Sequence, residues 1–159
     1  SLLTEEEQKS LALWTGMLGG SVGGVSCPRK WNQKQLAFFR FLEPSHRPQS
    51  ARFPFWPSAE EIKVAVRYYT SFRSWAVLFL NDKEKPVQKK YPISRLVGLE
   101  GAYVFEWEPG YSLDYGYFSK ISVNLQPHQS QLVWVSLKRE PPPKDLTLGG
   151  NIPAKQEER

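Results

Sequence analysis

Hydrophobic residues near the N-terminus recur with the period of an α-helix. The apolar residues at this spacing are Leu3, Leu11, Trp14 and Leu18. Thr4 and Glu7 form a capping box, in which each side chain accepts a hydrogen bond from the other residue's backbone amide. A Gly-Gly pair follows the last of these residues, as is common at helix C-termini. We therefore predict a helix from about residue 5 to residue 18, with the apolar residues on one face.

From residue 74 onward the pattern is that of β-strands. Short apolar runs, rich in aromatic and β-branched residues, are bounded by turn residues. The predicted strands cover residues 75–80, 102–107, 111–126 and 132–137. The longest of them is expected to bend or bulge near Gly116, because glycine in a strand often marks such a site.

The last two predicted strands are expected to form a hairpin through the turn at residues 127–130. Alternating Ile121, Val123 and Leu125 would form its core face. Trp134 then lies on the opposite face, which we expect to be exposed to water, as in antiparallel sheets with one solvated side.

Two segments fit either a helix or a strand. In residues 36–42 the apolar run fits both periods, and its aromatic residues favour a strand. In residues 58–69 a second capping box, made by Ser58 and Glu61, favours a helix, although strict alternation from residue 62 would suit a strand. The proline-rich residues 43–57 between them are predicted to be a loop.

These elements predict an α+β fold. We expect a mostly antiparallel sheet of four to six strands, an N-terminal helix and a second helix after Ser58. Residues 1–140 are expected to form a single globular domain, which suits a length of 159 residues. Three consecutive prolines after Glu140 cannot join a sheet interior, so residues 141–159 are predicted to be a flexible tail.

The composition indicates the compartment. Cys27 is the single cysteine, so no intramolecular disulfide can form, and a reducing compartment suits the chain. The longest uncharged run, residues 10–27, is too rich in glycine for a membrane span, and glutamates at residues 5–7 do not suit a signal peptide. We therefore expect a soluble, cytoplasmic protein.

The residues that could support catalysis are few. One cysteine and two histidines cannot complete a structural zinc site, which takes about four such ligands. Glu106 and Glu108 would share a face of a strand, but no histidine supports them, and we interpret them as an exposed edge. The sequence thus predicts no catalytic residues, no metal and no cofactor, and favours a protein that is not an enzyme.

The net charge of +5 is concentrated in one part of the chain. Residues 29–73 carry nine Lys and Arg against three Glu. Cations there can neutralise phosphates while neighbouring rings stack on unpaired bases. The candidate binding residues are Arg29, Lys30, Trp31, Lys34, Arg40, Arg47, Arg52, Trp56 and Trp134.

This pattern favours a non-catalytic accessory protein that binds single-stranded nucleic acid or RNA. The alternative is a small subunit or assembly factor of a multiprotein complex, because protein interfaces are also rich in aromatic residues and arginine. Both hypotheses require the basic residues and exposed rings to meet in one continuous patch.

Overall fold

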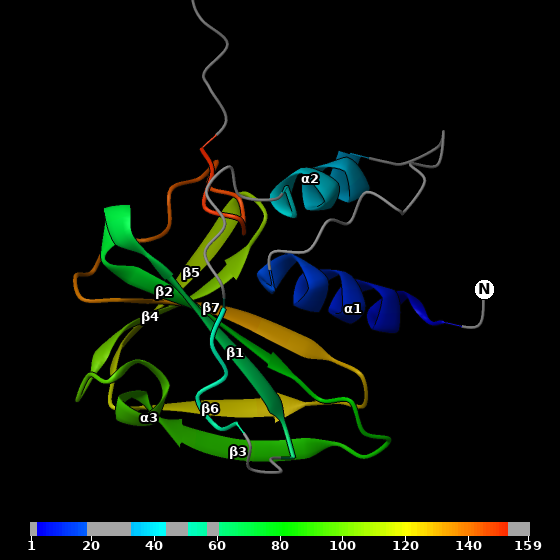
Figure 1. The fold of residues 1–159 in the computed structure, drawn as a ribbon, viewed down its shortest axis with the longest axis horizontal. Helices are drawn as coiled ribbons and strands as arrows, with labels where there is room; N and C mark the ends of the chain where they lie inside the picture. Colours follow the sequence, from blue (N-terminus) through cyan, green and yellow to red (C-terminus); the bar gives the residue numbers. More distant parts are fainter. Residues whose placement is uncertain (1–2, 19–32, 44–50, 57–60, 153–159) are drawn as a thin grey trace, which may run out of the picture.

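Two antiparallel sheets, with the two longer helices on one side of the larger sheet, make up the fold, which a computed structural model describes for residues 3–18, 33–43, 51–56 and 61–152 (Figure 1). The larger sheet has five strands in the order β1-β2-β7-β4-β5, and the smaller sheet pairs β3 with β6. Every strand pair is antiparallel. The predicted α+β class with a mostly antiparallel sheet is therefore confirmed.

The elements have the following bounds. The helices are α1 (Glu5–Met17), α2 (Gln33–Phe41) and the short α3 (Ile93–Val97), with a 3₁₀ turn at Thr70–Phe72. The strands are β1 (Lys63–Tyr69), β2 (Ser74–Leu80), β3 (Val87–Pro92), β4 (Ala102–Glu108), β5 (Tyr111–Phe118), β6 (Lys120–Leu125) and β7 (Ser130–Ser136). No helix among the described residues is long and apolar enough to cross a bilayer.

The five-stranded sheet has a core on each face. One face packs against the two-stranded sheet, and this core, which we call the sandwich side, is mainly aliphatic, with Val64, Val77, Val104, Val123 and Val133. The other face packs against α1, α2 and the C-terminal segment. This core, which we call the helix side, is rich in aromatic residues, with Phe41, Tyr69, Phe105, Trp107 and Trp134.

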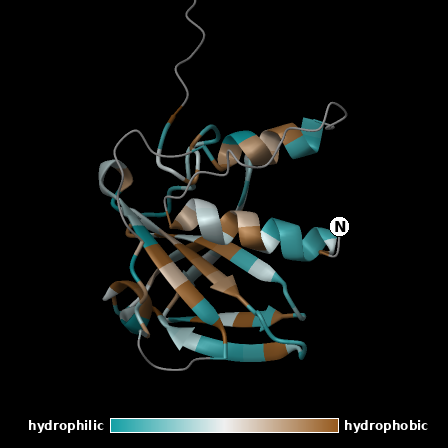
Figure 2. Ribbon diagram, turned by 45° about the vertical axis from the view of Figure 1, so that its right-hand side comes forward, coloured by the Kyte–Doolittle hydropathy of each residue, from teal (hydrophilic) through white to brown (hydrophobic). Residues whose placement is uncertain are grey.

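The predicted N-terminal helix is confirmed, with both hydrogen bonds of its capping box at 3.1 Å. The face that it buries differs from the predicted one. Leu13 and Met17 pack against the sheet, whereas Leu11 is 56% exposed and Leu18 is 42% exposed. The second half of α1 is largely apolar (Figure 2), so the spacing of its apolar residues could not fix which side meets the sheet.

Both ambiguous segments adopt the structure opposite to the predicted one. Residues 33–41 form α2 instead of a strand. Residues 63–69 form β1 instead of a helix, and residues 57–60, which include the second capping box's Ser58, lie outside the described residues. Because β1 is covered on both faces, consecutive residues are buried and the expected polar alternation is lost. The short apolar run of α2 does not define its period.

The predicted long strand and its hairpin are wrong. Residues 111–126 form two strands in different sheets, and β6 pairs with β3 while β7 pairs with β2 and β4. The turn before β7 holds His128 at a φ of 63° and carries the chain from one sheet to the other. The core face is nevertheless the predicted one, since Ile121, Val123 and Leu125 are buried on the sandwich side.

Residues 141–152 pack on the helix side, so the folded part extends beyond the predicted boundary at residue 140. Leu146 and Leu148 are buried. The backbone amide of Leu148 donates to the Phe41 carbonyl at 2.7 Å, and the Tyr69 hydroxyl donates to the Leu148 carbonyl at 2.6 Å. Burial raises the pKa of Tyr69, so this hydroxyl remains a donor. Residues 153–159 lie outside the described part of the chain.

Candidate functional site

The predicted binding residues lie on several elements. Four of them fall outside the described residues: Arg29, Lys30, Trp31 and Arg47. Two are exposed on α2: Lys34 and Arg40. Arg52 and Trp56 lie in the segment before β1, where Trp56 is 80% exposed.

The remaining predicted residue, Trp134, requires a correction. It is only 1% exposed, because β7 lies in the middle of a sheet that is covered on both faces. Trp134 therefore packs in the core of the helix side and offers no surface for stacking.

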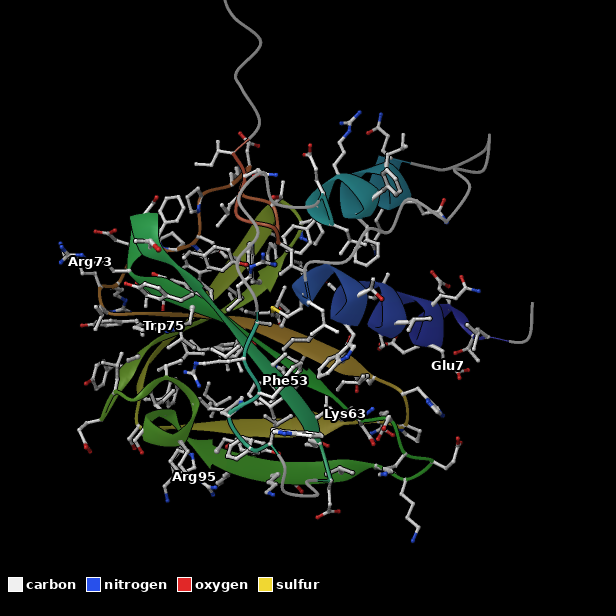
Figure 3. The ribbon with its side chains drawn as sticks, viewed as in Figure 1. Glu7, Phe53, Lys63, Arg73, Trp75 and Arg95 are labelled. Carbon is white, nitrogen blue, oxygen red and sulfur yellow. The ribbon has the colours of Figure 1, made fainter. Side chains whose placement is uncertain are left out.

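Several cations of the basic segment have contacts within the fold. Arg52 Nη2 donates to the Leu96 carbonyl at 2.5 Å, and Lys63 Nζ lies 3.2 Å from Asp82 Oδ2. Arg67 is buried. Figure 3 shows Lys63 and Arg73 at opposite ends of β1. The described cations of residues 29–73 therefore do not gather into one patch.

A partly open cleft lies where α1 and α2 meet the ends of β4 and β7. Its volume is about 320 Å³. The ladder between β4 and β7 pairs residues 103–106 with residues 133–136. Beyond these pairs, the end of β4 and the beginning of β7 line the cleft on one side, and α1 and α2 line it on the other.

The floor of the cleft is apolar and rigid. It consists of Leu13, Phe38, Phe41, Trp107 and Leu132. The Phe41 and Trp107 rings meet edge to face at 4.9 Å and 81°, and Trp107 meets Trp134 in the same way at 5.1 Å and 71°. Interlocked rings of this kind hold one another in a fixed orientation. The aromatic core of the helix side thus supports the cleft.

The rim of the cleft is polar. It carries Lys9, Glu106, Glu108, Asn124, Gln129 and Gln131. Tyr115 holds Glu106 in place, because its hydroxyl donates to Glu106 Oε1 at 2.7 Å. Burial, followed by the hydrogen bond to Glu106, raises the pKa of Tyr115 to about 12, so the hydroxyl keeps its proton at neutral pH.

A bulge in β5 directs Tyr115 toward Glu106. The register between β4 and β5 shifts there, so that Val104 lies opposite Gly116 whereas Phe105 lies opposite Asp114. Tyr115 is the extra residue. The irregularity predicted near Gly116 is therefore present, and it brings the Tyr115 hydroxyl to Glu106, which lines the cleft.

Helix α1 is joined to the turn before β7, next to the cleft. The Ser10 hydroxyl donates to the His128 carbonyl at 2.6 Å. His128 Nε2 lies 2.8 Å from Glu84 Oε1, and His128 Nδ1 lies 3.8 Å from Glu7 Oε2. Figure 3 shows Glu7 at the N-terminal end of α1. These contacts fix the position of α1, and hence of one wall of the cleft.

The other end of α1 rests on a buried arginine. Arg67 is 2% exposed, and its Nη1 donates to the carbonyls of Gly16 and Met17 at 3.4 and 3.3 Å. A cation at a helix C-terminus is favourable, because the helix dipole places partial negative charge on these carbonyls. Arg67 Nη2 has no hydrogen-bond partner among the described residues.

Only part of this cleft can be predicted from the sequence. The pattern of β4 predicts that Glu106 and Glu108 share a strand face, but at an exposed edge and not at a cleft. The amide side chains of the rim carry no sequence signal, because they reach the cleft only after β6 and β7 join different sheets. Within the described residues, no group of three His, Cys, Asp or Glu could hold a metal ion.

The fold is one that solved structures of glycosidases share. A β-L-arabinopyranosidase of glycoside hydrolase family 27 from Geobacillus stearothermophilus matches with a TM-score of 0.64 and 17% identity, over 85% of this chain and 31% of that one. The α-galactosidase I of Mortierella vinacea gives a TM-score of 0.61 and 11% identity, over 85% and 37%.

The α-galactosidase of Saccharomyces cerevisiae, solved with raffinose, gives a TM-score of 0.59 and 8% identity, over 87% and 45%. This chain therefore spans less than half the length of these enzymes. No protein-family model matches the sequence, and neither does the sequence of any curated protein.

These comparisons correct the predicted function. The prediction of a non-catalytic protein that binds nucleic acid, with a subunit or assembly factor as the alternative, is contradicted because the solved structures with this fold are glycosidases. The prediction that the protein is not an enzyme is contradicted on the same ground. The basic composition of residues 29–73 does not indicate a binding patch, because Arg52, Lys63 and Arg67 make separate contacts within the fold.

Proposed function

We propose that this chain is a portion of a glycosidase, made of the sheet domain together with two helices that pack against it. The fold match carries the proposal, since it covers 85–87% of the chain in three glycosidases from different organisms. Because the chain spans 31–45% of their length, further polypeptide would complete the enzyme.

The exposed apolar side of α1 supports this proposal. Leu11 and Leu18 lie one above the other, seven residues apart, and neither packs against the sheet. A helix that is apolar on two sides is typical of the interior of a larger protein. The additional polypeptide would cover this side of α1.

The proposed substrates are glycosides of the kinds that the similar enzymes are named for. These are α-galactosides and β-L-arabinopyranosides. The two classes resemble each other, because L-arabinopyranose has the ring of D-galactopyranose without its hydroxymethyl group.

A direct assay tests the proposal. The polypeptide that carries this sequence is incubated with nitrophenyl α-D-galactopyranoside and nitrophenyl β-L-arabinopyranoside, and release of nitrophenol is followed by absorbance. We expect hydrolysis of one of the two. Nitrophenyl α-D-glucopyranoside serves as the control, since it differs from the galactoside only at one hydroxyl. A folded protein that releases nitrophenol from neither of the first two substrates would contradict the proposal.

A further inference from the structure

We infer that the cleft between α1, α2 and the ends of β4 and β7 binds a neutral saccharide. The choice of a saccharide rests on the proposed glycosidase function, whereas the presence of a ligand site rests on the cleft itself. The similarity to the solved enzymes does not itself assign a ligand to this cleft.

The first argument is the hydrogen-bonding capacity of the rim. Asn124 and Gln131 each offer two N–H donors and a carbonyl acceptor, and neither side chain has a hydrogen bond to another described residue. Gln129 Oε1 accepts from the backbone amide of Gln126 at 2.8 Å, which leaves its two N–H donors available. The rim therefore presents several planar side-chain amides, and each of them can bind two neighbouring hydroxyls of a ligand.

The second argument is a buried polar atom in the wall of the cleft. Ser130 Oγ is inaccessible to solvent and has no hydrogen-bond partner within the described part of the chain. A buried hydroxyl without a partner costs free energy. Ser130 lines the cleft, so a rotation of its side chain toward the cleft would let this hydroxyl bind a hydroxyl of the ligand.

The third argument is the contrast between floor and rim. Phe38 is half-buried and, like Trp107, belongs to the apolar floor. A pyranose has an apolar C–H face and a polar circumference of hydroxyls. The ring of such a sugar can therefore lie on the floor while its hydroxyls reach the rim. A volume of about 320 Å³ is within the range of small-molecule sites.

The charge of the rim narrows the ligand class. Glu106 and Glu108 are balanced by one cation, Lys9, so the rim has a negative excess. Anionic ligands such as phosphates are therefore disfavoured. The cleft also lacks three acidic or imidazole groups that could hold a metal cation among the described residues. A neutral polyhydroxylated ligand satisfies both conditions.

Amide NMR spectra of the 159-residue chain, recorded during titration with D-galactose, L-arabinose or raffinose, test this inference. A ligand of this size is expected to bind with a Kd of about 1–10 mM. The shifted signals should come from residues at the ends of β4, β6 and β7. Inorganic phosphate should shift none of them.

A double variant, Asn124→Ala with Gln131→Ala, is expected to weaken binding about tenfold, because it removes hydrogen-bond partners of the ligand. Ser122→Ala is the matched control, since Ser122 is exposed on the same face of β6 as Asn124 but does not line the cleft. Its Kd should be unchanged. The midpoint of thermal unfolding verifies that each variant is folded.

Two results would overturn the inference. One is the absence of saccharide-induced shifts in the folded chain up to about 100 mM sugar, roughly a hundred times the lower expected Kd. The other is a double variant that binds as tightly as the unmodified chain, which would locate the sugar elsewhere. Hydrolysis of glycosides without binding in the cleft would reject this inference alone, whereas binding without hydrolysis would contradict the proposed glycosidase.

Discussion

The two faces of the five-stranded sheet are built from different kinds of residues. The sandwich side is a mainly aliphatic core between two sheets, with valines from β1, β2, β4, β6 and β7. The helix side instead contains a network of aromatic rings and a buried arginine. In the strand register, Arg67, Ala76 and Trp134 lie side by side on this face.

The polar groups of the two faces differ as well. On the helix side, Arg67 Nη2 and Trp134 Nε1 are buried without a hydrogen-bond partner among the described residues. The cleft and the exposed leucines of α1 are on the same side. The sandwich side is held together mainly by dispersion and the burial of aliphatic side chains. The helix side contains polar groups and apolar surface that are not satisfied within the described residues, which is the condition expected of a side that receives a ligand or further polypeptide.

The largest expected effect that tests this contrast comes from Trp134. Trp134→Ala should lower the free energy of unfolding by about 3–5 kcal/mol, because the ring supports both Tyr69 and Trp107. Trp134→Phe should cost less, about 1 kcal/mol, since it keeps an aromatic ring and removes an N–H that has no partner. Urea unfolding followed by circular dichroism measures both. Equal losses for the two variants would show that the N–H has a partner in solution.

Arg67 gives the next largest effect. Arg67→Ala should cost about 2–3 kcal/mol, because it leaves the last carbonyls of α1 unpaired in a buried site. Arg67→Met keeps the volume and removes a buried charge, so its cost should be smaller. Urea unfolding again provides the measurement. On the sandwich side, Val77→Ala is the control for lost volume without charge. If Met were as costly as Ala, the charge itself would be the stabilising feature.

The burial of the five-stranded sheet on both faces also limits how much of this structure the sequence predicts. The capping box of α1 and the alternation in β6 are local signals, and both were interpreted correctly. The sequence predicts a helix at β1, because cores on both faces of this strand remove the alternation that identifies a strand. The sequence predicts an exposed Trp134, because the strands that pair with β7 are far away in the sequence.

The cleft could be predicted even less. Its lining combines residues from α1, α2, β4 and the segment from β6 to β7, and no spacing in the sequence connects them. The amide residues of the rim are also common on ordinary surfaces. These residues lie beside β4 only because the chain passes at His128 from β6, in the smaller sheet, to β7, in the larger one.

A smaller effect is expected from the joint between α1 and the turn before β7. Ser10→Ala should lower the free energy of unfolding by about 1 kcal/mol, because it removes the hydrogen bond to the His128 carbonyl in a partly buried site. The change should also increase the rate of amide hydrogen exchange in α1 more than in β3 and β6. Ser122→Ala, on the exposed face of β6, is the control. Equal exchange rates in α1 for both variants would argue against this joint.

The smallest expected effect is a dependence of stability on pH that arises from Glu7 in the first turn of α1. Hydrogen bonding with Thr4 lowers the pKa of Glu7 from its usual value of 4.5, and the charge of His128 contributes in the same direction. A carboxyl group with a lowered pKa in the folded state adds stability above its unfolded pKa, and this stability is lost as the pH falls through the folded pKa. The melting temperature of the unmodified chain should therefore exceed that of Glu7→Gln near neutral pH, and the difference should shrink below about pH 4.

Glutamine can still complete the capping box, so the difference reports the charge and not the helix cap itself. Glu100→Gln, an exposed glutamate outside α1, is the control and should show no such convergence. A constant difference between the unmodified chain and Glu7→Gln across this range would mean that the negative charge of Glu7 does not stabilise the folded state.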